Sequence, residues 1–199
     1  MKSFLFYLFY YTSKAIALLP LKAMFIFSDI ARFFTYHVVR YRRKVVAENL
    51  KNSFPDKSPK ELKRIEKAYY KHLCDLFIEI IYLLHASPKK AERVCKFNNL
   101  DLIHKYYNEG KSIIVAAGHY SNWEVLSLYA FYTKHEVLGV YKPIVNKKFE
   151  EFINKSRERF GCITVPMQDT FRTVLSYQKQ KKLFTLVLFT DQTPSKWIS

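Results

Sequence analysis

The second half of the chain alternates short apolar runs with longer segments of mixed polarity. β-Branched and aromatic residues dominate the apolar runs, which therefore predict strands. These strands are expected at residues 112–117, 136–141, 162–166 and 183–190. The segments between them predict helices, at residues 122–133, 147–160 and 170–180. Because the run LFTLVLFT is apolar on both faces, it indicates a buried strand, and the alternation predicts a mainly parallel α/β sheet flanked by helices.

The first forty residues have a different amino-acid composition. Phe4–Val39 is dense in aromatic and aliphatic residues, and a few charges such as Lys14 and Lys22 interrupt it. Its longest run without charge, Ser3–Ser13, is shorter than the ~18–20 apolar residues of a membrane span. Aromatic residues beside scattered cations are typical of a helix at a membrane interface. We therefore expect residues 1–40 to form a membrane-associated helical segment, and a helix that docks on the folded domain is the alternative.

Residues 41–110 are expected to form a basic helical region. Nine basic and three acidic residues lie between Arg40 and Arg64, which favours anionic lipid headgroups over a merely solvated helix face. Ser58, Pro59 and Glu61 have the spacing of a capping box and predict a helix start. The apolar residues that follow recur at helical spacing and predict a buried stripe that ends near His85. Its expected members are Leu62, Ile65, Tyr69, Leu73, Leu76, Phe77, Ile80 and Leu84.

Composition and charge narrow the class of protein. The 199 residues are 49% hydrophobic and 17% aromatic, which excludes a disordered chain and a collagen. Three separated cysteines without a CxxC pair indicate neither a zinc site nor a disulfide framework, and we expect no metal. The net charge of +16 predicts a polyanionic partner. Nucleic acid, anionic lipid and an acidic protein are the three candidates.

The candidate catalytic and binding residues lie at the carboxyl ends of the predicted strands. In open α/β sheets, sites form just beyond these ends. His119 follows the first strand, Tyr141 and Lys142 end the second, and Asp191 follows the last. The strand pattern alone therefore directs a histidine and an acid to one edge of the sheet, within residues 111–199.

His119 is the candidate general base. Glu124 lies five positions on, in the first turn of the next helix, where its carboxylate is expected to bind one imidazole nitrogen and leave the other facing the site. The alternative is a capping box formed by Ser121 and Glu124, which would give the acid a structural role. Nucleophile elbows, Walker loops and HExxH motifs are absent, so we expect His119 to activate a substrate hydroxyl.

Several segments together resemble a known family. The His-x4-Glu pattern of HYSNWE is similar to that of the bacterial lipid A lauroyl/myristoyl acyltransferases, within the lysophospholipid acyltransferase-like superfamily. Other segments occur in the family's order: YRRKVVAENLKNSFP (41–55), KAYYKHLCDLFIEII (67–81), YKP (141–143), Asn146, RERFG (157–161) and DQTP (191–194). The resemblance covers nearly the whole chain and implies a glycerolipid-acyltransferase-like fold.

The resemblance also implies an enzymatic activity and a cellular location. An O-acyltransferase of this kind moves a fatty acyl chain from a thioester on acyl carrier protein to a hydroxyl of a lipid A precursor, at the cytoplasmic face of the bacterial inner membrane and without a cofactor. His119 would take the hydroxyl proton and Glu124 would orient it. Arg157, with Arg159 as the competing assignment, would bind phosphate or stabilise negative charge. Substrate-binding candidates are also Asn122, Tyr141, Lys142, Asn146 and Asp191, the last with a structural cap as its alternative.

The chain departs from the family at its C-terminus. Family members continue well beyond the DQ segment, so we expect an incomplete sheet, in a truncated chain or a divergent short form. An inactive fragment or non-catalytic lipid-binding relative is therefore one rival. A basic nucleic-acid-binding protein is the other, but the aromatic residues do not alternate with arginine along a strand, and no nucleic-acid partner is expected.

Overall fold

The computed structural model describes residues 2–191, which form two compact units. Residues 11–82 make up one unit, and the first ten residues join the chain from Leu83 onward in the other. Two helices, α1 (Lys2–Ala17) and α4 (Pro59–His85), contribute residues to both units. Each unit is described by itself below. Residues 192–194 of the DQTP segment lie outside the described residues.

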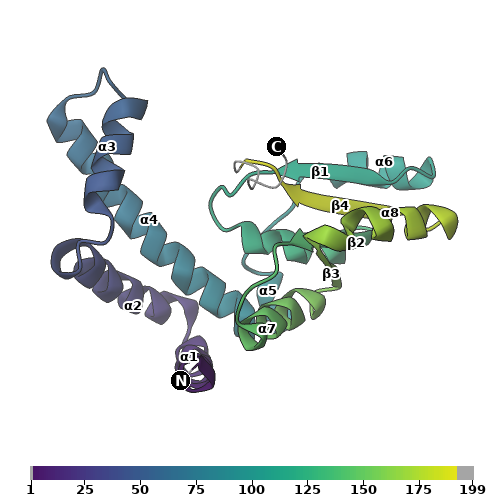
Figure 1. The fold of residues 1–199 in the computed structure, drawn as a ribbon, viewed down its shortest axis with the longest axis horizontal. Helices are drawn as coiled ribbons and strands as arrows, with labels where there is room; N and C mark the ends of the chain where they lie inside the picture. Colours follow the sequence, from purple (N-terminus) through teal and green to yellow (C-terminus); the bar gives the residue numbers. More distant parts are fainter. Residues whose placement is uncertain (1, 192–199) are drawn as a thin grey trace. The chain divides into compact units, whose positions relative to one another are not determined.

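The larger unit contains a parallel four-stranded sheet, labelled in Figure 1. Its strands are β1 (Ile113–Ala117), β2 (Glu136–Tyr141), β3 (Cys162–Pro166) and β4 (Phe184–Phe189). The spatial order is β1-β4-β2-β3, and all three pairings are parallel. The α/β class and the four predicted strands are therefore confirmed.

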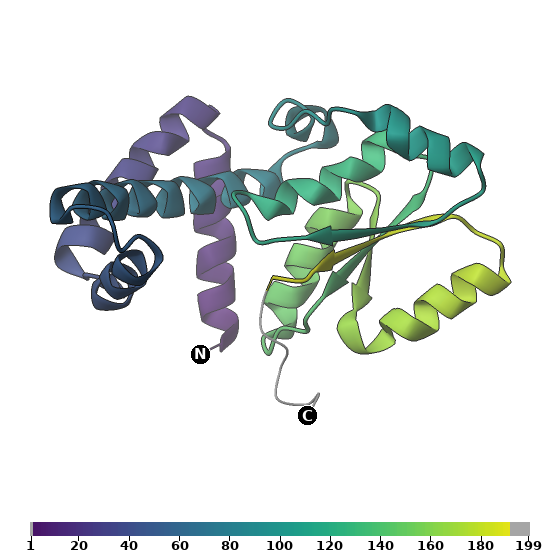
Figure 2. The same cartoon turned by 90° about the horizontal axis from the view of Figure 1, so that it is seen from above.

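Helices cover both faces of the sheet, as Figure 2 shows. On one face, α6 (Leu100–Asn108) and the 3₁₀-helix η2 (Trp123–Tyr132) pack around Val137 and Val187. On the other face, α8 (Thr170–Lys179) packs on Leu138 and Leu186. Three further segments complete the unit: α5 (Pro88–Ala91), α7 (Lys147–Glu158) and η3 (Met167–Asp169).

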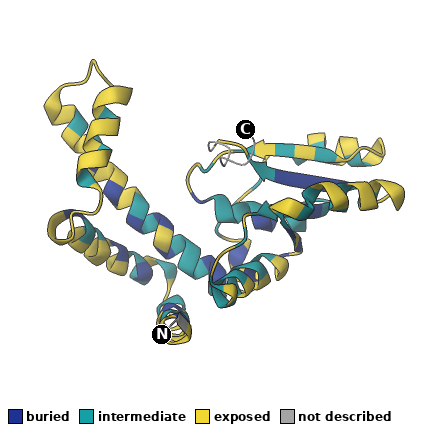
Figure 3. Cartoon of the chain, viewed as in Figure 1, coloured by how far each residue is buried: buried dark blue, intermediate teal, exposed yellow. Residues whose placement is uncertain are grey.

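Strand β4 is the centre of this core. Its first four residues are buried, and the strand is dark blue over much of its length in Figure 3. Because β4 pairs with β1 on one side and β2 on the other, both of its backbone edges are hydrogen-bonded. This position explains why LFTLVLFT carries no polar face. It also sets the C-terminal end of β4 beside the C-terminal end of β1, where the candidate residues lie.

The segment after β1 differs from its prediction in winding. Residues 122–133 were expected to form an ordinary helix, and the structure has ten residues of 3₁₀-helix instead. Such a length is unusual, because 3₁₀ runs rarely exceed one turn. The hydroxyl of Ser127 donates to the carbonyl of Glu124, three residues before it, at 2.7 Å. The tight winding brings Glu124 and Ser127 onto one side of the helix.

The N-terminal part of α1, up to Tyr10, packs within the larger unit. Phe6 is buried and makes edge contacts with Phe149 and Phe152 of α7. Lys148 lies 4.5 Å from the centre of the Tyr7 ring. Phe4, Leu5 and Leu8, by contrast, are exposed on the same helix. One face of this part of α1 is therefore a docking face, as in the alternative raised from the sequence, and another is apolar and open to its surroundings.

The smaller unit is helical. It contains α2 (Leu21–Phe33), the π-helical turn η1 (Phe34–Val38), α3 (Arg43–Ser53) and most of α4. Glu66 is buried and paired with Arg43 and Lys63, at 3.1 and 2.9 Å. The predicted stripe on α4 is correct in part: Leu76 and Leu84 are buried, but Tyr69 and Phe77 are exposed.

The predicted capping box at the start of α4 is confirmed. The Ser58 amide donates to the Glu61 carboxylate at 3.0 Å, and the Glu61 amide donates to the Ser58 hydroxyl at 3.3 Å. Two backbone donors that the helix cannot satisfy are thereby paired.

We expect Ser58→Ala to lower the free energy of unfolding by about 1 kcal/mol, because the variant loses this N-cap. Urea unfolding measures the change. Ser87→Ala is the matched control, since Ser87 occupies the N-cap of α5 without a side-chain cap hydrogen bond. Equal changes in the two variants would contradict a specific role for the Ser58 cap.

Within residues 2–191, no helix has both the length and the apolarity required to cross a bilayer.

Candidate active site

His119 lies on the loop that follows β1, and Asp191 holds it. The imidazole Nδ1 is 2.8 Å from Oδ1 of Asp191, and the backbone amide of His119 donates to Oδ2 at 2.7 Å. One carboxylate therefore binds both the ring and the main chain of the same residue.

The order of the strands explains this pairing. His119 lies two residues beyond β1 and Asp191 two residues beyond β4, and these strands are direct neighbours. The amide of Thr190 donates to the carbonyl of Ala117 at 3.0 Å, which ties the two strand ends together. The hydrogen bonds from the side chain and the backbone of His119 lower the pKa of Asp191 below its ordinary value. The carboxylate is therefore ionised at neutral pH.

Aromatic side chains flank the imidazole. The ring centre of His119 lies 4.7 Å from that of Phe189 and 5.1 Å from that of Trp123. These contacts, together with the bond to Asp191, restrict the ring to one orientation. With a proton on Nδ1 donated to the carboxylate, the neutral imidazole has its basic lone pair on Nε2.

The start of η2 is capped by Asn122. Its side-chain oxygen accepts from the Glu124 amide at 3.2 Å, and Asn122 is buried. Ser121 does not cap the helix, because its backbone is left-handed with a φ of 52°. The Ser121–Glu124 capping box raised as an alternative is therefore wrong. A left-handed conformation at a non-glycine residue is strained, and such strain concentrates at functional sites.

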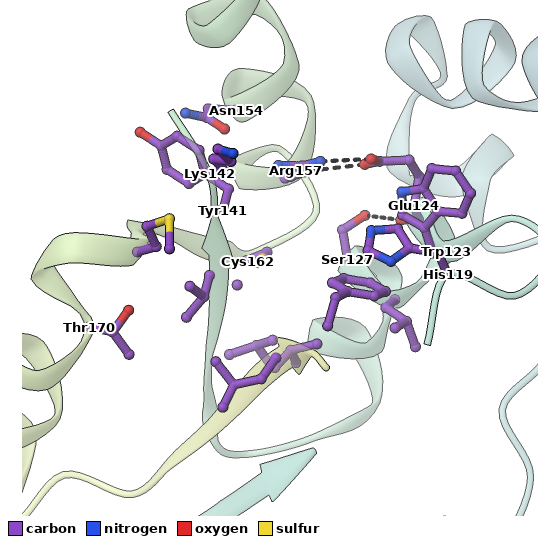
Figure 4. Close-up of a pocket in the computed structure, with 18 of the residues that line it drawn as sticks. His119, Trp123, Glu124, Ser127, Tyr141, Lys142, Asn154, Arg157, Cys162 and Thr170 are labelled. Atoms are coloured by element: carbon purple, nitrogen blue, oxygen red, sulfur yellow. Dashed lines mark hydrogen bonds and ion pairs between the residues drawn. The ribbon is translucent and has the colours of Figure 1, made fainter. Parts of the chain in front are cut away.

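Glu124 is paired with Arg157 of α7. Nε and Nη2 of the guanidinium donate to the two carboxylate oxygens at 2.9 and 2.6 Å, the two dashed lines between these residues in Figure 4. Burial opposes the charge on Arg157, but the hydrogen bonds and charge of Glu124 outweigh it and raise the pKa of the guanidinium. The guanidinium is thus ionised, and the two side chains are fixed in a bidentate geometry.

The predicted pairing of Glu124 with the imidazole is wrong. In the structure, the carboxylate on His119 Nδ1 belongs to Asp191, and both oxygens of Glu124 accept from Arg157. Within the described residues, the carboxylate of Asp191 accepts from His119 at the end of a strand. The helix-cap alternative for Asp191 concerns residues 192 onward, which lie outside the described residues.

A cavity of about 700 Å³ opens beside these pairs. In Figure 4, His119 and Trp123 lie on the η2 side of the cavity, and Tyr141 and Lys142 lie across it on the β2 side. Its lining is partly apolar, with Leu126, Val187 and Phe189 among the contributors. The sequence-derived candidates that share this lining are His119, Glu124, Tyr141, Lys142 and Arg157.

A family model described as "Bacterial lipid A biosynthesis acyltransferase" matches residues 1–196. The chain belongs to this family. No curated protein matches the chain. Membership identifies the protein as an acyltransferase of lipid A biosynthesis, which acts on lipid substrates.

Three other candidates have structural contacts in this acyltransferase. Arg159 donates to the carbonyls of Leu84 and Ala86, each at 2.8 Å, and so caps the C-terminal end of α4. The side chain of Asn146 accepts from the Lys148 amide and caps α7. With Asn122 capping η2, these residues fix the helices around the cavity and are not part of its lining.

Asn154 and Cys162 are among the lining residues that the sequence analysis missed. Asn154 lies on α7 one turn before Arg157, and this helical spacing could have suggested it. Cys162 lies at the start of β3, close to Gly139: a Cβ at that glycine would stand 2.8 Å from the cysteine sulfur. Burial raises the pKa of the Cys162 thiol to about 11. The thiol is therefore protonated at neutral pH and is a poor nucleophile.

Among the residues that the structure describes, no cluster of three histidine, cysteine or acidic side chains is arranged to hold a metal ion.

Proposed function

We propose that the protein transfers a fatty acyl chain from an acyl thioester, carried by acyl carrier protein, to a hydroxyl of a lipid A precursor. The observation that supports this most directly is the imidazole of His119, held through Nδ1 by Asp191 at the edge of a partly apolar cavity. A base in this tautomer is the group that activates a hydroxyl without a protein nucleophile.

The proposed reaction requires one base and no covalent enzyme intermediate. Nε2 of His119 takes the proton of the acceptor hydroxyl while its oxygen attacks the thioester carbonyl carbon. The tetrahedral intermediate then collapses, the carbon–sulfur bond breaks, and the imidazolium returns its proton to the departing thiolate. The products are an ester and a thiol, and the base is regenerated. The carboxylate of Asp191 stabilises the imidazolium during the reaction.

The pair of Arg157 and Glu124 is proposed to hold negative charge. A guanidinium has five N–H donors, and the bidentate bond to Glu124 engages two of them. The others suit a phosphate of the acceptor or the oxyanion of the intermediate. Lys142, which also lines the cavity, adds a second cation. The apolar part of the lining would receive the acyl chain.

The net charge of +16 suits both proposed substrates, because acyl carrier proteins are acidic and lipid A precursors carry phosphates. The exposed apolar residues of α1 and α2, among them Phe4, Leu5, Ile26 and Ile30, support contact with a bilayer. We place this contact at the cytoplasmic face of the bacterial inner membrane, where thioester donors are available.

The test is a comparison of lipids from cells with and without the gene product. We expect lipid A from producing cells to gain the mass of one acyl chain, measured by mass spectrometry of lipid A and of total lipids. The matched control is the His119→Ala variant at equal abundance, which should leave lipid A unchanged. A gain confined to other lipids would reject lipid A as the acceptor, and no gain in any lipid would reject acyl transfer.

A further inference from the structure

A second cavity lies within residues 11–82. It has a volume of about 150 Å³ and lies among residues of α2, η1 and α4. Its lining combines basic and aromatic side chains and has no carboxylate: Arg32, Phe33, Tyr36, His37, Lys67 and Tyr70. A small cavity with this lining suits an anion that carries several acceptor oxygens.

One buried polar atom at this cavity lacks a hydrogen-bond partner among the described residues. It is Nε of Arg32. The same guanidinium uses Nη2 to bind Asp29 at 3.2 Å, so the carboxylate engages another nitrogen. A buried donor without an acceptor is costly, because it loses its bonds to water and gains none in exchange. An oxyanion in the cavity would satisfy the Arg32 donor.

The local backbone is irregular here. Phe34–Val38, which carries both Tyr36 and His37, is a π-helical turn. Two residues follow with left-handed backbone, Arg40 with a φ of 53° and Arg42 with a φ of 50°. π-Turns and left-handed non-glycine residues are energetically unfavourable and occur preferentially at functional sites. This irregularity is independent of the unpartnered Arg32 donor and begins two residues after it in the chain.

The surroundings of Tyr36 reinforce the positive potential. Its ring lies 4.4 Å from the guanidinium carbon of Arg43 and 5.3 Å from the Lys63 ammonium. The nearby acid, Glu66, is already paired with both of these cations. Lys67 and His37 are exposed and accessible from the solvent.

Exposed apolar side chains adjoin the cavity. Phe33, Phe34, Val38 and Val39 each expose more than half of their surface, at 56%, 53%, 60% and 67%. A free anion in water gains nothing from such neighbours. A phosphate that is attached to acyl chains gains contact with them, because they can enter the interfacial layer beside the headgroup.

We propose that this cavity binds the phosphate group of a membrane lipid headgroup. Arg32 and Lys67 supply charge-assisted hydrogen bonds to the phosphate oxygens, and His37 lies at the same opening. The adjoining apolar residues contact the lipid around the headgroup. The inference extends the proposed membrane contact and does not rest on acyl transfer, so the His119→Ala variant is expected to bind lipid as the unaltered chain does.

The test compares two double variants of the full chain in vesicle co-sedimentation. Arg32→Gln with Lys67→Gln removes two cations of the cavity, one from α2 and one from α4. The matched control, Lys22→Gln with Lys60→Gln, removes one cation from each of the same helices outside the lining. The vesicles contain phosphatidylcholine mixed equally with phosphatidate, or with enough oleate to match the surface charge. Circular dichroism verifies that both variants are folded.

On phosphatidate vesicles, we expect the cavity variant to bind about tenfold more weakly than the control, because it loses hydrogen bonds as well as charge. On oleate vesicles, the two variants should bind equally. Equal loss on phosphatidate would overturn the site in favour of general charge attraction. Inorganic phosphate that bound the unaltered chain as tightly as a short-chain phosphatidate would overturn the lipid as its source.

Discussion

His119→Ala is expected to slow acyl transfer by about 10³-fold, the largest effect of any single substitution in the chain. A positioned general base contributes typically ~10²–10⁴-fold, and the cavity lining includes no other histidine. The turnover of an acyl-carrier-protein thioester into acylated lipid measures the rate. Binding of the acceptor should change little, because the imidazole acts on the hydroxyl proton rather than on the lipid as a whole.

The control for this substitution is His104→Ala. His104 is an exposed histidine of α6 in the same unit, and its Nε2 lies 3.0 Å from the carbonyl of Tyr132, away from the cavity lining. Its loss should leave the rate within about twofold, as expected for a surface position. If the His119 variant kept its full rate while folded, the general-base role would be excluded.

The strands of the sheet were predictable because their chemistry is local. EVLGVY and CITVP coincide with β2 and β3 residue for residue, and the doubly apolar LFTLVLFT corresponds to the central strand β4. A strand whose two faces are both buried in a parallel sheet has apolar side chains at successive positions, and this run is visible in the sequence. The rule that sites form at the carboxyl ends of parallel strands then predicts that His119 and Asp191 lie at the same edge of the sheet.

The pairing of the site residues was not predictable in the same way. His119 and Asp191 are 72 positions apart, and Glu124 and Arg157 are 33 apart. Their contacts depend on β4 inserting between β1 and β2, which no periodicity encodes. Spacing suggested instead that the acid five positions after His119 would hold it. Proximity in the sequence therefore favoured Glu124, whereas the order of the strands places Asp191 beside the imidazole.

The smaller unit shows a second limit of sequence patterns. On α4, Glu66 is buried while Tyr69 and Phe77 are exposed, the reverse of the order that hydrophobicity predicts. Glu66 is buried because Arg43 and Lys63 neutralise it from α3 and from its own helix. A pattern of apolar positions cannot anticipate a buried charge whose partner comes from another helix.

Asp191→Asn and Glu124→Gln are expected to separate the roles of the two carboxylates. Asp191→Asn should slow transfer by about 10²-fold with stability nearly unchanged, because an exposed carboxylate that orients the base is lost. The loss should appear in kcat, with KM within about twofold, because the carboxylate acts through the imidazole and not on the substrate. A merely structural role would instead lower the free energy of unfolding together with the rate.

Glu124→Gln should behave differently, because it leaves the half-buried guanidinium of Arg157 without its bidentate partner. Removing one partner of this ion pair costs about 3 kcal/mol, so the free energy of unfolding measured in urea should fall by about that amount. Adding Arg157→Gln should then cost much less than it does in the unaltered chain, which a double-mutant cycle measures. Should Glu124→Gln instead lower kcat by about 10²-fold at unchanged stability, Glu124 and not Asp191 would be the acid that orients the imidazole during turnover.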